Sequence, residues 1–382
     1  MASLEPYGGL PQEYFEAPNS LPVMDSPTYS GLIAIGILAT ISLIFTSTLL
    51  SFISYRMIAW KNHYSSFIGK NQCVLLIYQL ILADFMQSLG FLISFHWTAQ
   101  RSIDGPNGAC FAQGWLIQIG DVASAFFVLA IALHTTYQVI LSRSVSYKWF
   151  VTTICGIWAI ALLLTSLAPI TGGRYVFLRA GVWCWISQDH EDLRLLLHYL
   201  WIFVVQFGSI IIYSTCFWYL FRAKRPGAIR IQGASIEALN KAARAMLAYA
   251  LVYTIVTLPL AAGRMASMSG HGLSDNYYLF AGALFTSAGW VDTLLYAFTR
   301  RALLFNELNG DGANHARAGG RPDPGFPRQN STDDMLAEGD FSRFGGIKTE
   351  RTVKVEMDDL ESHGSGSEGG GKFYHSAKAY AE

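Results

Sequence analysis

Seven long apolar stretches lie between Ser30 and Arg300, and charged residues rarely interrupt them. The hydrocarbon core of a bilayer is about 30 Å thick, so a helix needs roughly 20 apolar residues to cross it. Because lipid offers no water to the polar groups of the backbone, each of these stretches must be helical. The sequence therefore predicts an all-α membrane protein, built as a bundle of seven transmembrane helices.

The seven predicted spans differ in length, and the third and fifth are longer than a bilayer requires. The spans are Ser30–Ser54, Gln72–Trp97, Cys110–Leu141, Trp149–Pro169, Leu195–Phe221, Ala245–Gly263 and Tyr277–Thr299. We expect the two longest spans to tilt or to project past the membrane on one side.

Lys and Arg residues in the loops predict the orientation, because short cytoplasmic loops are richer in them than external loops. The richer set of loops carries Arg56, Lys61, Lys70, Arg143, Lys148, Arg222, Lys224, Arg225, Arg230, Lys241, Arg300 and Arg301. The opposite set carries Arg101, Arg174, Arg179, Arg194 and Arg264. We therefore expect the N-terminus outside the cell and the C-terminus in the cytoplasm of a multi-pass plasma-membrane protein.

The chain divides into three predicted regions. An extracellular segment covers residues 1–29, the transmembrane domain covers 30–301, and a cytoplasmic tail covers 302–382. The tail is rich in Gly, Ser and charged residues from Asn309 onward, so we expect most of it to be disordered. Its first residues, Ala302–Leu308, could either lie along the membrane as a short helix or fray from the last span. The formal net charge is zero, which gives no argument for binding nucleic acid.

Two of the five cysteines are predicted to lie on the outer side. Cys110 opens the third span, and Cys184 lies in the loop between the fourth and fifth spans. Both would then face an oxidising compartment, where disulfides persist. We expect a Cys110–Cys184 disulfide that pins the outer loop across the mouth of the bundle.

Three carboxylates lie deep within the predicted spans. A rise of 1.5 Å per residue places Asp84 about 18 Å and Asp292 about 12 Å from the cytoplasmic side, and Asp121 about 17 Å below the outer surface. No Lys or Arg occurs at that depth, so we expect three unpaired carboxylates that share protons, bind water or coordinate a cation. Two interpretations of these carboxylates, and of Tyr296 four positions after Asp292, remain open. They form either a polar core that changes its packing when a ligand binds, or a fixed hydrogen-bond network that only orders the helices.

Other polar and aromatic residues define two candidate surfaces. The residues expected to line or cap the outer half of the bundle, and to contact a small ligand together with Asp121, are Gln87, His96, Gln118, Trp183, Trp185, His198 and Gln206. The residues expected at the cytoplasmic end, where a partner protein could bind, are His134, Tyr137, Arg143, Arg222, Lys224, Arg225 and Lys241. Taken singly, residues like those of the outer set are more often packing or interface residues, and His134 is also compatible with an interfacial position that has no special role. Pro259 is expected to kink the sixth span and to act as its hinge.

Several short motifs occur in a fixed order along the spans. They are Leu82-Ala83-Asp84-Phe85, Gly120-Asp121, Ile131-Ala132-Leu133-His134-Thr135, Trp183-Cys184-Trp185-Ile186, Leu258-Pro259-Leu260-Ala261-Ala262-Gly263-Arg264-Met265 and Val291-Asp292-Thr293-Leu294-Leu295-Tyr296. Over residues 30–301 the set resembles the fungal G protein-coupled receptors of the glucose-receptor and cyclic-AMP-receptor-like group. The segment Trp183-Cys184-Trp185-Ile186 is also similar to one in slime-mould cyclic AMP receptors.

The resemblance implies a receptor that binds a nutrient or small signalling molecule outside and activates the α subunit of a heterotrimeric G protein inside, feeding cyclic AMP signalling. It also implies the Cys110–Cys184 link, no enzymatic activity and no cofactor. The chain departs from rhodopsin-like receptors in two places. His134-Thr135-Thr136-Tyr137 stands where an Asp-Arg-Tyr triplet is usual, and Asp292 and Tyr296 lack the intervening proline of the familiar Asn-Pro-x-x-Tyr pattern.

Other classes of membrane protein fit less well. A retinal pump or sensor needs a lysine in the last span for its Schiff base, and Tyr277–Thr299 contains none. A transporter should show repeated halves or broken helices, and a membrane metallohydrolase needs several ligands at one depth. Neither pattern is apparent, so no metal site is predicted, and a seven-span transporter or intramembrane hydrolase is kept as the alternative.

Overall fold

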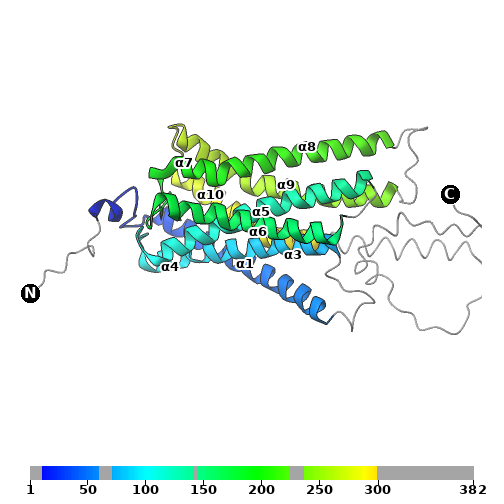
Figure 1. The fold of residues 1–382 in the computed structure, drawn as a ribbon. Coiled ribbons are helices and arrows are strands. Elements are labelled where there is room, and N and C mark those ends of the chain that lie inside the picture. Colours follow the sequence, from blue (N-terminus) through cyan, green and yellow to red (C-terminus); the bar gives the residue numbers. More distant parts are fainter. Residues whose placement is uncertain (1–10, 60–70, 142–144, 224–235, 299–382) are drawn as a thin grey trace, which may run out of the picture. The chain divides into compact units, whose positions relative to one another are not determined.

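The computed structural model describes residues 11–59, 71–141, 145–223 and 236–298. Seven helical segments in this part of the chain are long and apolar enough to cross a membrane: Ser26–Ile58, Gln72–Gln100, Gly108–Gln138, Tyr147–Gly172, Gln188–Tyr219, Leu251–Met268 and Asp275–Phe298. They lie side by side as a bundle, so the predicted fold class is confirmed (Figure 1). The predicted tail, 302–382, lies outside the described residues, and so do Arg143, Lys224 and Arg225 of the predicted inner loops.

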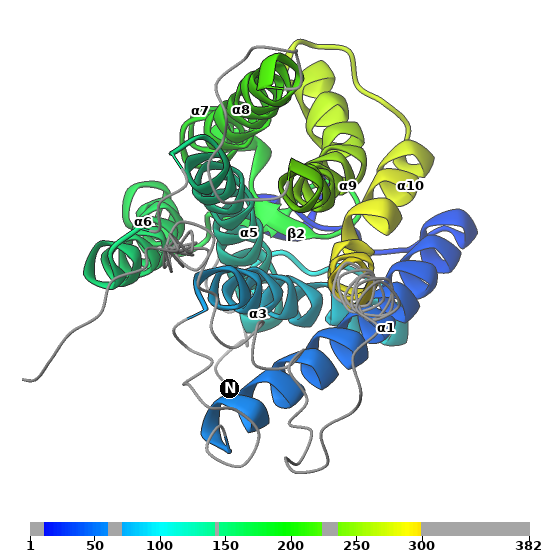
Figure 2. The same cartoon turned by 90° about the vertical axis from the view of Figure 1, so that its right-hand side faces the viewer.

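Helix α5 is the central element of the bundle, as the view down the helices shows (Figure 2). It packs against four other helices. The bounds of α5 and these neighbours are Gly108–Leu141 for α5, Gln72–Leu92 for α3, Tyr147–Gly172 for α6, Leu200–Ala223 for α8 and Ile236–Met268 for α9. On the far side of α3, helix α1 (Ser26–Ile58) contacts α3 and α10 (Asp275–Thr286).

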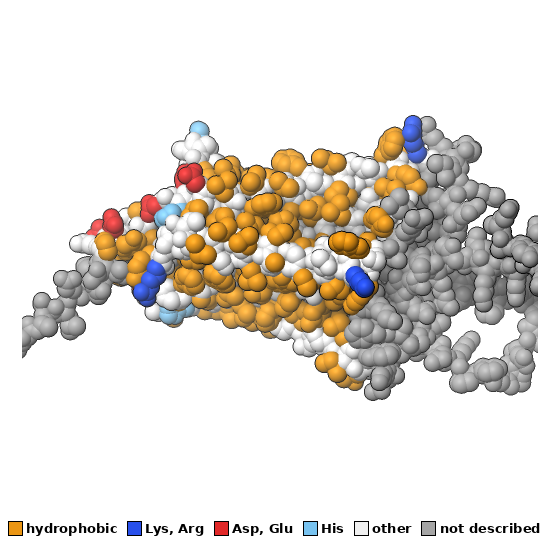
Figure 3. Space-filling view, in the orientation of Figure 1, with side chains coloured by type: hydrophobic (Ala, Val, Ile, Leu, Met, Phe, Trp, Pro, Cys, Tyr) orange, Lys and Arg blue, Asp and Glu red, His pale blue; other side chains and the backbone are white. Residues whose placement is uncertain are grey.

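The lateral surface of the bundle is apolar. Large side chains such as Ile37, Phe207 and Phe217 are 51%, 62% and 70% exposed. On the face drawn in Figure 3, apolar side chains cover the sides, whereas charged side chains gather at the two ends. Such a belt suits contact with lipid, because an exposed apolar surface of this extent is rare on a protein surrounded by water.

Two predicted spans are each interrupted by a one-residue turn. The second span was expected to run unbroken from Gln72 to Trp97, but α3 ends at Leu92 and α4 covers Ser94–Gln100. The reason is a shift in hydrogen bonding, because the N–H of Ile93 donates to the carbonyls of Gly90 and Phe91. The last span has a similar turn, where Ser287 donates to Leu284, and the helix continues over residues 288–298.

The fifth span begins with one turn of π-helix, Leu195–Tyr199, before α8. It follows a 3-10 turn, Gln188–His190, and a single helical turn, α7 (Glu191–Arg194). The sequence predicted a single regular helix here, and apolar composition cannot reveal such a change. Arg194, expected in an exposed loop, is only 2% exposed, and its Nε and Nη2 both donate to the carbonyl of Ile186.

The sixth span is longer than predicted. Helix α9 runs without interruption from Ile236 through Pro259 to Met268, whereas the sequence placed the last residue of this span at Gly263. Arg264, which was assigned to an outer loop, is therefore a helical residue and is only 3% exposed. The prediction placed Arg264 in a loop because it is charged, although its partners lie inside the protein.

A short hairpin lies across one end of the bundle. Strand β1 (Phe177–Arg179) pairs antiparallel with β2 (Cys184–Ile186), with Leu178 opposite Trp185. The disulfide Cys110–Cys184 joins β2 to the first turn of α5, as predicted. We call this end of the bundle the disulfide end. In Figure 2, β2 crosses the far end of the bundle beside α5 and α9.

The segment before α1 covers the hairpin. After a 3-10 turn, Gln12–Phe15, Leu21 forms an antiparallel bridge with Ile103, and the N–H of Arg179 donates to the carbonyl of Asn19. Burial lowers the pKa of the Arg179 guanidinium, an effect that the carboxylates of Asp275 and Asp25 partly offset. The hairpin is thus enclosed between the helices and the N-terminal segment.

The packing of α3 on α5 yields a testable prediction. A Cβ placed on Gly120 would lie 2.7 Å from the backbone N of Gln87 and 2.9 Å from the carbonyl O of Ala83. Because backbone atoms cannot move aside cheaply, Gly120→Ala should force the two helices apart and destabilise the protein by about 1–3 kcal/mol. The measurement is the midpoint of thermal unfolding in detergent micelles.

Gly156→Ala on α6 is the matched control for this substitution. Nothing lies within 4 Å of a Cβ placed there, so the same added methyl group should leave the unfolding midpoint unchanged or raise it slightly. Equal midpoints for the two variants would contradict close contact between α3 and α5.

Candidate functional site

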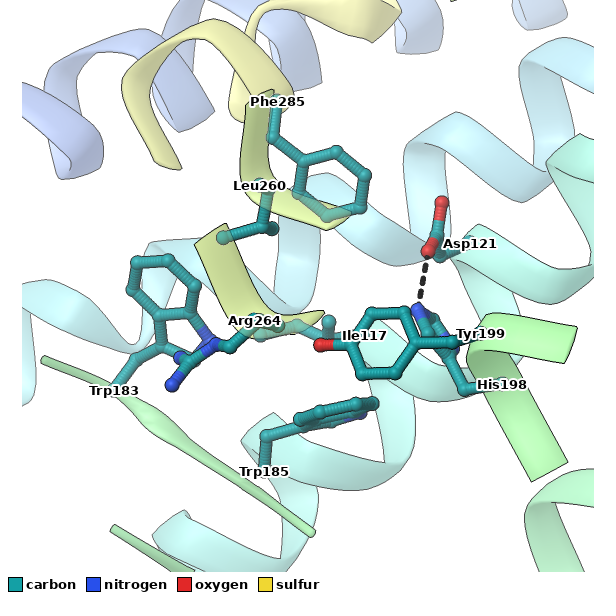
Figure 4. A pocket seen from close by; sticks show the side chains of 9 residues that line it. All are labelled: Ile117, Asp121, Trp183, Trp185, His198, Tyr199, Leu260, Arg264 and Phe285. Carbon is teal, nitrogen blue, oxygen red and sulfur yellow. Dashed lines mark ion pairs between the residues drawn. The ribbon is translucent and has the colours of Figure 1, made fainter. Parts of the chain in front are cut away.

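A cavity of about 20 Å³ lies beneath the hairpin at the disulfide end. Its lining comes from α5, the hairpin, the π-helical turn, α9 and α10 (Figure 4). The lining residues are Ile117, Asp121, Trp183, Trp185, His198, Tyr199, Leu260, Arg264 and Phe285. Five elements distant in sequence therefore meet at one small, mostly aromatic cavity that also contains charged groups.

The π-helical turn determines which residues of the fifth span face this cavity. His198 and Tyr199 are neighbours in sequence, yet both are buried and both line the cavity. Successive residues of an α-helix point about 100° apart, so a regular helix would favour one of them over the other. Single turns of π-helix occur frequently at functional sites.

His198 and Asp121 form a buried ion pair between η4, the π-helical turn Leu195–Tyr199, and α5. Nε2 of His198 lies 2.9 Å from Oδ2 of Asp121, and the two side chains are 8% and 4% exposed. The prediction that Asp121 is unpaired is wrong. It was based on the absence of Lys and Arg at that depth, whereas the partner is a histidine on another helix. The pair fixes the start of the fifth span against the centre of the bundle.

Gln118, one helical turn before Asp121 on α5, fixes the wall of the cavity. Its Oε1 accepts a hydrogen bond of 2.9 Å from Nε1 of Trp185, and its Nε2 donates to the carbonyl of Leu197 at 3.0 Å. The edge of the His198 ring meets the Trp185 ring at a centroid distance of 4.8 Å. The orientation of Trp185 is thus determined by α5 and by the π-helical turn together.

Arg264 places a guanidinium at the opposite side of the cavity. Its Nη2 donates to the carbonyl of Ala180, and its guanidinium carbon lies 4.4 Å from the Tyr278 ring centroid and 5.6 Å from that of Trp183. The turn of the hairpin approaches it closely at Gly181, where φ is +80° and an added Cβ would lie 3.3 Å from Nη1. Glycine is required there for both reasons.

Asp84 and Asp292 form a second buried group, on the side of Asp121 away from the hairpin. Oδ1 of Asp84 accepts a hydrogen bond of 2.8 Å from the Ser124 hydroxyl, and the Asp84 and Asp292 carboxyl groups lie near enough to interact electrostatically. Tyr296 is buried one turn further along the same helix. Asp84 and Asp292 are therefore neighbours, whereas Asp121 pairs with His198.

The structure separates the predicted ligand-contacting residues into three groups. Asp121, Trp183, Trp185 and His198 line the cavity, and Gln118 holds Trp185 from behind. Gln87 and Gln206 are buried in other parts of the bundle, whereas His96 is exposed on α4 and contacts the Trp97 ring. The predicted set thus contains four of the lining residues and omits five.

The omitted lining residues are Ile117, Tyr199, Leu260, Arg264 and Phe285. Three of them are ordinary apolar residues that no sequence pattern distinguishes from packing residues. Arg264 could have been found, because it follows Pro259 by less than two helical turns and a helix extended to that point would carry it inward.

At the end opposite the disulfide, the candidate coupling residues differ in exposure. His134 is 7% exposed and packs on the Phe150 ring, with centroids 5.7 Å apart. Tyr137 and Arg222 are exposed, and Arg222 lies over the Trp218 ring. Lys241 belongs to α9, but its side chain is not among those described.

The ion pair between Asp121 and His198 should be measurable by a double-mutant cycle. We expect Asp121→Asn and His198→Gln to destabilise the protein together by less than the sum of the two single effects, with a coupling of about 1.5–3 kcal/mol, because each substitution removes the same charged hydrogen bond. The measurement is the free energy of unfolding in mixed micelles. Asp121→Asn combined with Thr152→Val, on the exposed face of α6, should be additive.

Comparison with known proteins agrees with the seven-helix bundle. Residues 69–292 match the family described as "7 transmembrane receptor (rhodopsin family)". The fold is similar to that of squid rhodopsin, with a TM-score of 0.53 and 17% sequence identity, covering 86% of this chain and 94% of that one. No curated protein sequence matches significantly. The chain belongs to the seven-transmembrane receptors of the rhodopsin family.

Proposed function

We propose that this protein is a plasma-membrane receptor that binds a small extracellular molecule in the cavity beneath the hairpin and activates the α subunit of a heterotrimeric G protein. The observation that carries the proposal is the cavity itself. It joins charged groups of α5, η4 and α9 under a hairpin held by a disulfide, in a chain of the rhodopsin receptor family. Membership of that family does not favour the transporter or hydrolase alternative.

The distribution of charge supports an extracellular position for the disulfide end. Exposed acidic residues such as Asp25, Glu191 and Asp275 lie at that end, and the disulfide requires an oxidising compartment. Arg56, which is half-buried, and Lys148, which is exposed, lie near the ends of α1 and α6 that are opposite the disulfide, which fits the rule that positive residues face the cytoplasm.

The contacts of α9 provide a route from the cavity to the cytoplasmic side. Leu260 and Arg264 line the cavity on either side of Gly263, and Pro259 precedes them. Tyr277 donates to the carbonyl of Pro259 at 2.6 Å, and Tyr278 donates to that of Gly263 at 2.9 Å. A ligand that displaces Leu260 or Arg264 would act on α9 next to its hinge, and the inner part of α9 would move relative to α5.

The finer features of the proposal rest on the motifs. The ordered set that includes Trp183-Cys184-Trp185-Ile186 supports placement among the fungal glucose-receptor and cyclic-AMP-receptor-like group, a role in nutrient sensing and an output through cyclic AMP. The G protein would bind at the end that carries His134, Tyr137, Arg143, Arg222, Lys224, Arg225 and Lys241.

The orientation can be tested in intact cells. We expect an epitope tag after Glu382 to be inaccessible to antibody until the cells are permeabilised, because an odd number of spans places the two ends of the chain on opposite sides. A tag before Gln12 should be accessible without permeabilisation. Labelling of the C-terminal tag on intact cells would overturn the orientation and, with it, the extracellular position of the cavity.

Signalling can be tested in cells that report cyclic AMP. We expect at least one sugar, amino acid, organic acid or nucleotide to change the response, and Asp121→Asn and Asp292→Asn each to shift its half-maximal concentration by about fivefold or more. Both substitutions alter buried polar contacts between helices that must move against each other. Gly156→Ala, at equal surface expression, is the control and should respond as the unaltered receptor does. Identical responses of both aspartate variants and the control would remove these carboxyls from the mechanism.

A further inference from the structure

Two buried guanidinium groups lie at or near the cavity, and neither is paired with a carboxylate: Arg264 lines the cavity, and Arg194 lies over the ring of Trp185, which also lines it. Arg264 bonds to the carbonyl of Ala180, and Arg194 bonds to that of Ile186. Within the described part of the chain, neither forms an ion pair. The two arginines lie near enough to each other to repel.

The carboxylate that lines the cavity already has a partner. Asp121 is the single carboxylate among the lining residues, and it pairs with His198. Glu191, on the turn that carries Arg194, is exposed to solvent, where charge interactions are strongly screened. With Asp121 paired to His198, the guanidinium groups of Arg264 and Arg194 have no carboxylate among the lining residues to pair with, which leaves an excess of positive charge beside the cavity.

Two buried arginines without a carboxylate partner lower the stability of the bundle. A buried charge that lacks a counter-ion is destabilising, and carbonyl oxygens and ring faces compensate only in part. An apolar residue at either position would pack under the hairpin without that cost. The uncompensated charge is therefore suited to an anion that comes from outside the chain.

The shape of the cavity adds a second requirement. Trp183, Trp185 and Tyr199 form flat walls, and in Figure 4 the Tyr199 ring lies between the Arg264 guanidinium and the Asp121–His198 pair. The Tyr199 ring would thus separate an anionic group near Arg264 from the Asp121 carboxylate. A cavity of about 20 Å³ accommodates little more than one water-sized group, so a larger ligand must displace part of the lining.

We propose that the ligand of this cavity is a small organic anion whose carboxylate or phosphate group pairs with Arg264 and whose flat body lies against the aromatic walls. The inference rests on the proposed receptor function and specifies its ligand. The planar guanidinium can bind either anion through two hydrogen bonds. Binding would draw Arg264 from the carbonyl of Ala180, which releases α9 from the hairpin.

The experiment compares acids with uncharged counterparts of the same shape. Purified receptor in nanodiscs is incubated with butyrate, benzoate or phenylacetate, and separately with the matching amides, and its thermal unfolding is followed. A second arm uses phenyl phosphate and inorganic phosphate to separate the two anion classes. We expect at least one anion to stabilise the receptor with an affinity about tenfold or more above that of its uncharged counterpart.

Substitutions of Arg264 test whether the preference for anions depends on this residue. Arg264→Gln should abolish the preference for the anion, and Arg264→Lys should retain part of it, because lysine keeps the charge without the fork of donors. Arg174→Gln is the matched control, since Arg174 is exposed near the same end and should not affect binding. Equal stabilisation by acids and amides, no stabilisation by any anion, or a preference that survives Arg264→Gln would each overturn the proposal.

The test is independent of G-protein coupling because it measures unfolding alone. If anions stabilise the receptor but no G protein responds, the proposed function fails while the ligand assignment stands. If a neutral molecule activates the G protein equally through unaltered receptor and Arg264→Gln, the receptor function stands and the anion assignment fails. If Arg264→Gln does not fold, the comparison of acids with amides on the unaltered receptor and on Arg264→Lys still tests the anion assignment.

Discussion

The architecture of the candidate site depends on the attachment of the hairpin to the first turns of α5. The Cys110–Cys184 disulfide provides the covalent part of this attachment. Gln113, one turn further along α5, provides the polar part, because its Oε1 accepts hydrogen bonds from the N–H of Cys184 at 2.9 Å and from Nε1 of Trp97 at 2.8 Å. One side chain thereby connects β2, α4 and α5. Trp183 and Trp185 flank the bridged cysteine, so fixing Cys184 fixes the two rings that cover the cavity.

The pairing of polar groups inside this bundle follows from the absence of water in a bilayer. Each charged or amide group must find its partner within the protein, and the resulting contacts join different helices rather than neighbours in sequence. Asp121 with His198, Gln118 with Trp185, and Asp84 with Ser124 all cross between elements. In the apolar environment that surrounds them, these few contacts contribute more to the unique arrangement of the helices than the many apolar contacts, which are less directional.

Hydropathy and charge sufficed to predict the seven spans and the disulfide, because the length of an apolar stretch and the side on which a cysteine lies are properties of the sequence itself. The interior of the site was harder to predict. The π-helical turn at Leu195–Tyr199 and the turn at Ile93 arise from shifts of one hydrogen bond, which leave no mark on hydropathy. Arg194 and Arg264 were assigned to loops because arginine is normally exposed. Their carbonyl and aromatic partners come from distant segments, and only the folded structure brings these together.

The contacts around Pro259 explain why ligand chemistry and helix movement would be linked in this receptor. Tyr277 and Tyr278 attach α9 to α10 through the carbonyls of Pro259 and Gly263, and Arg264 attaches it to the hairpin. All three contacts lie within six residues of α9, in the part of the helix nearest the disulfide end. A proline lacks the N–H that would stabilise the preceding turn, so bending is easiest at this point. A ligand that replaces even one of these three contacts changes the constraint on α9 where the helix is weakest, and a small displacement there becomes a larger one at the far end of a rigid helix.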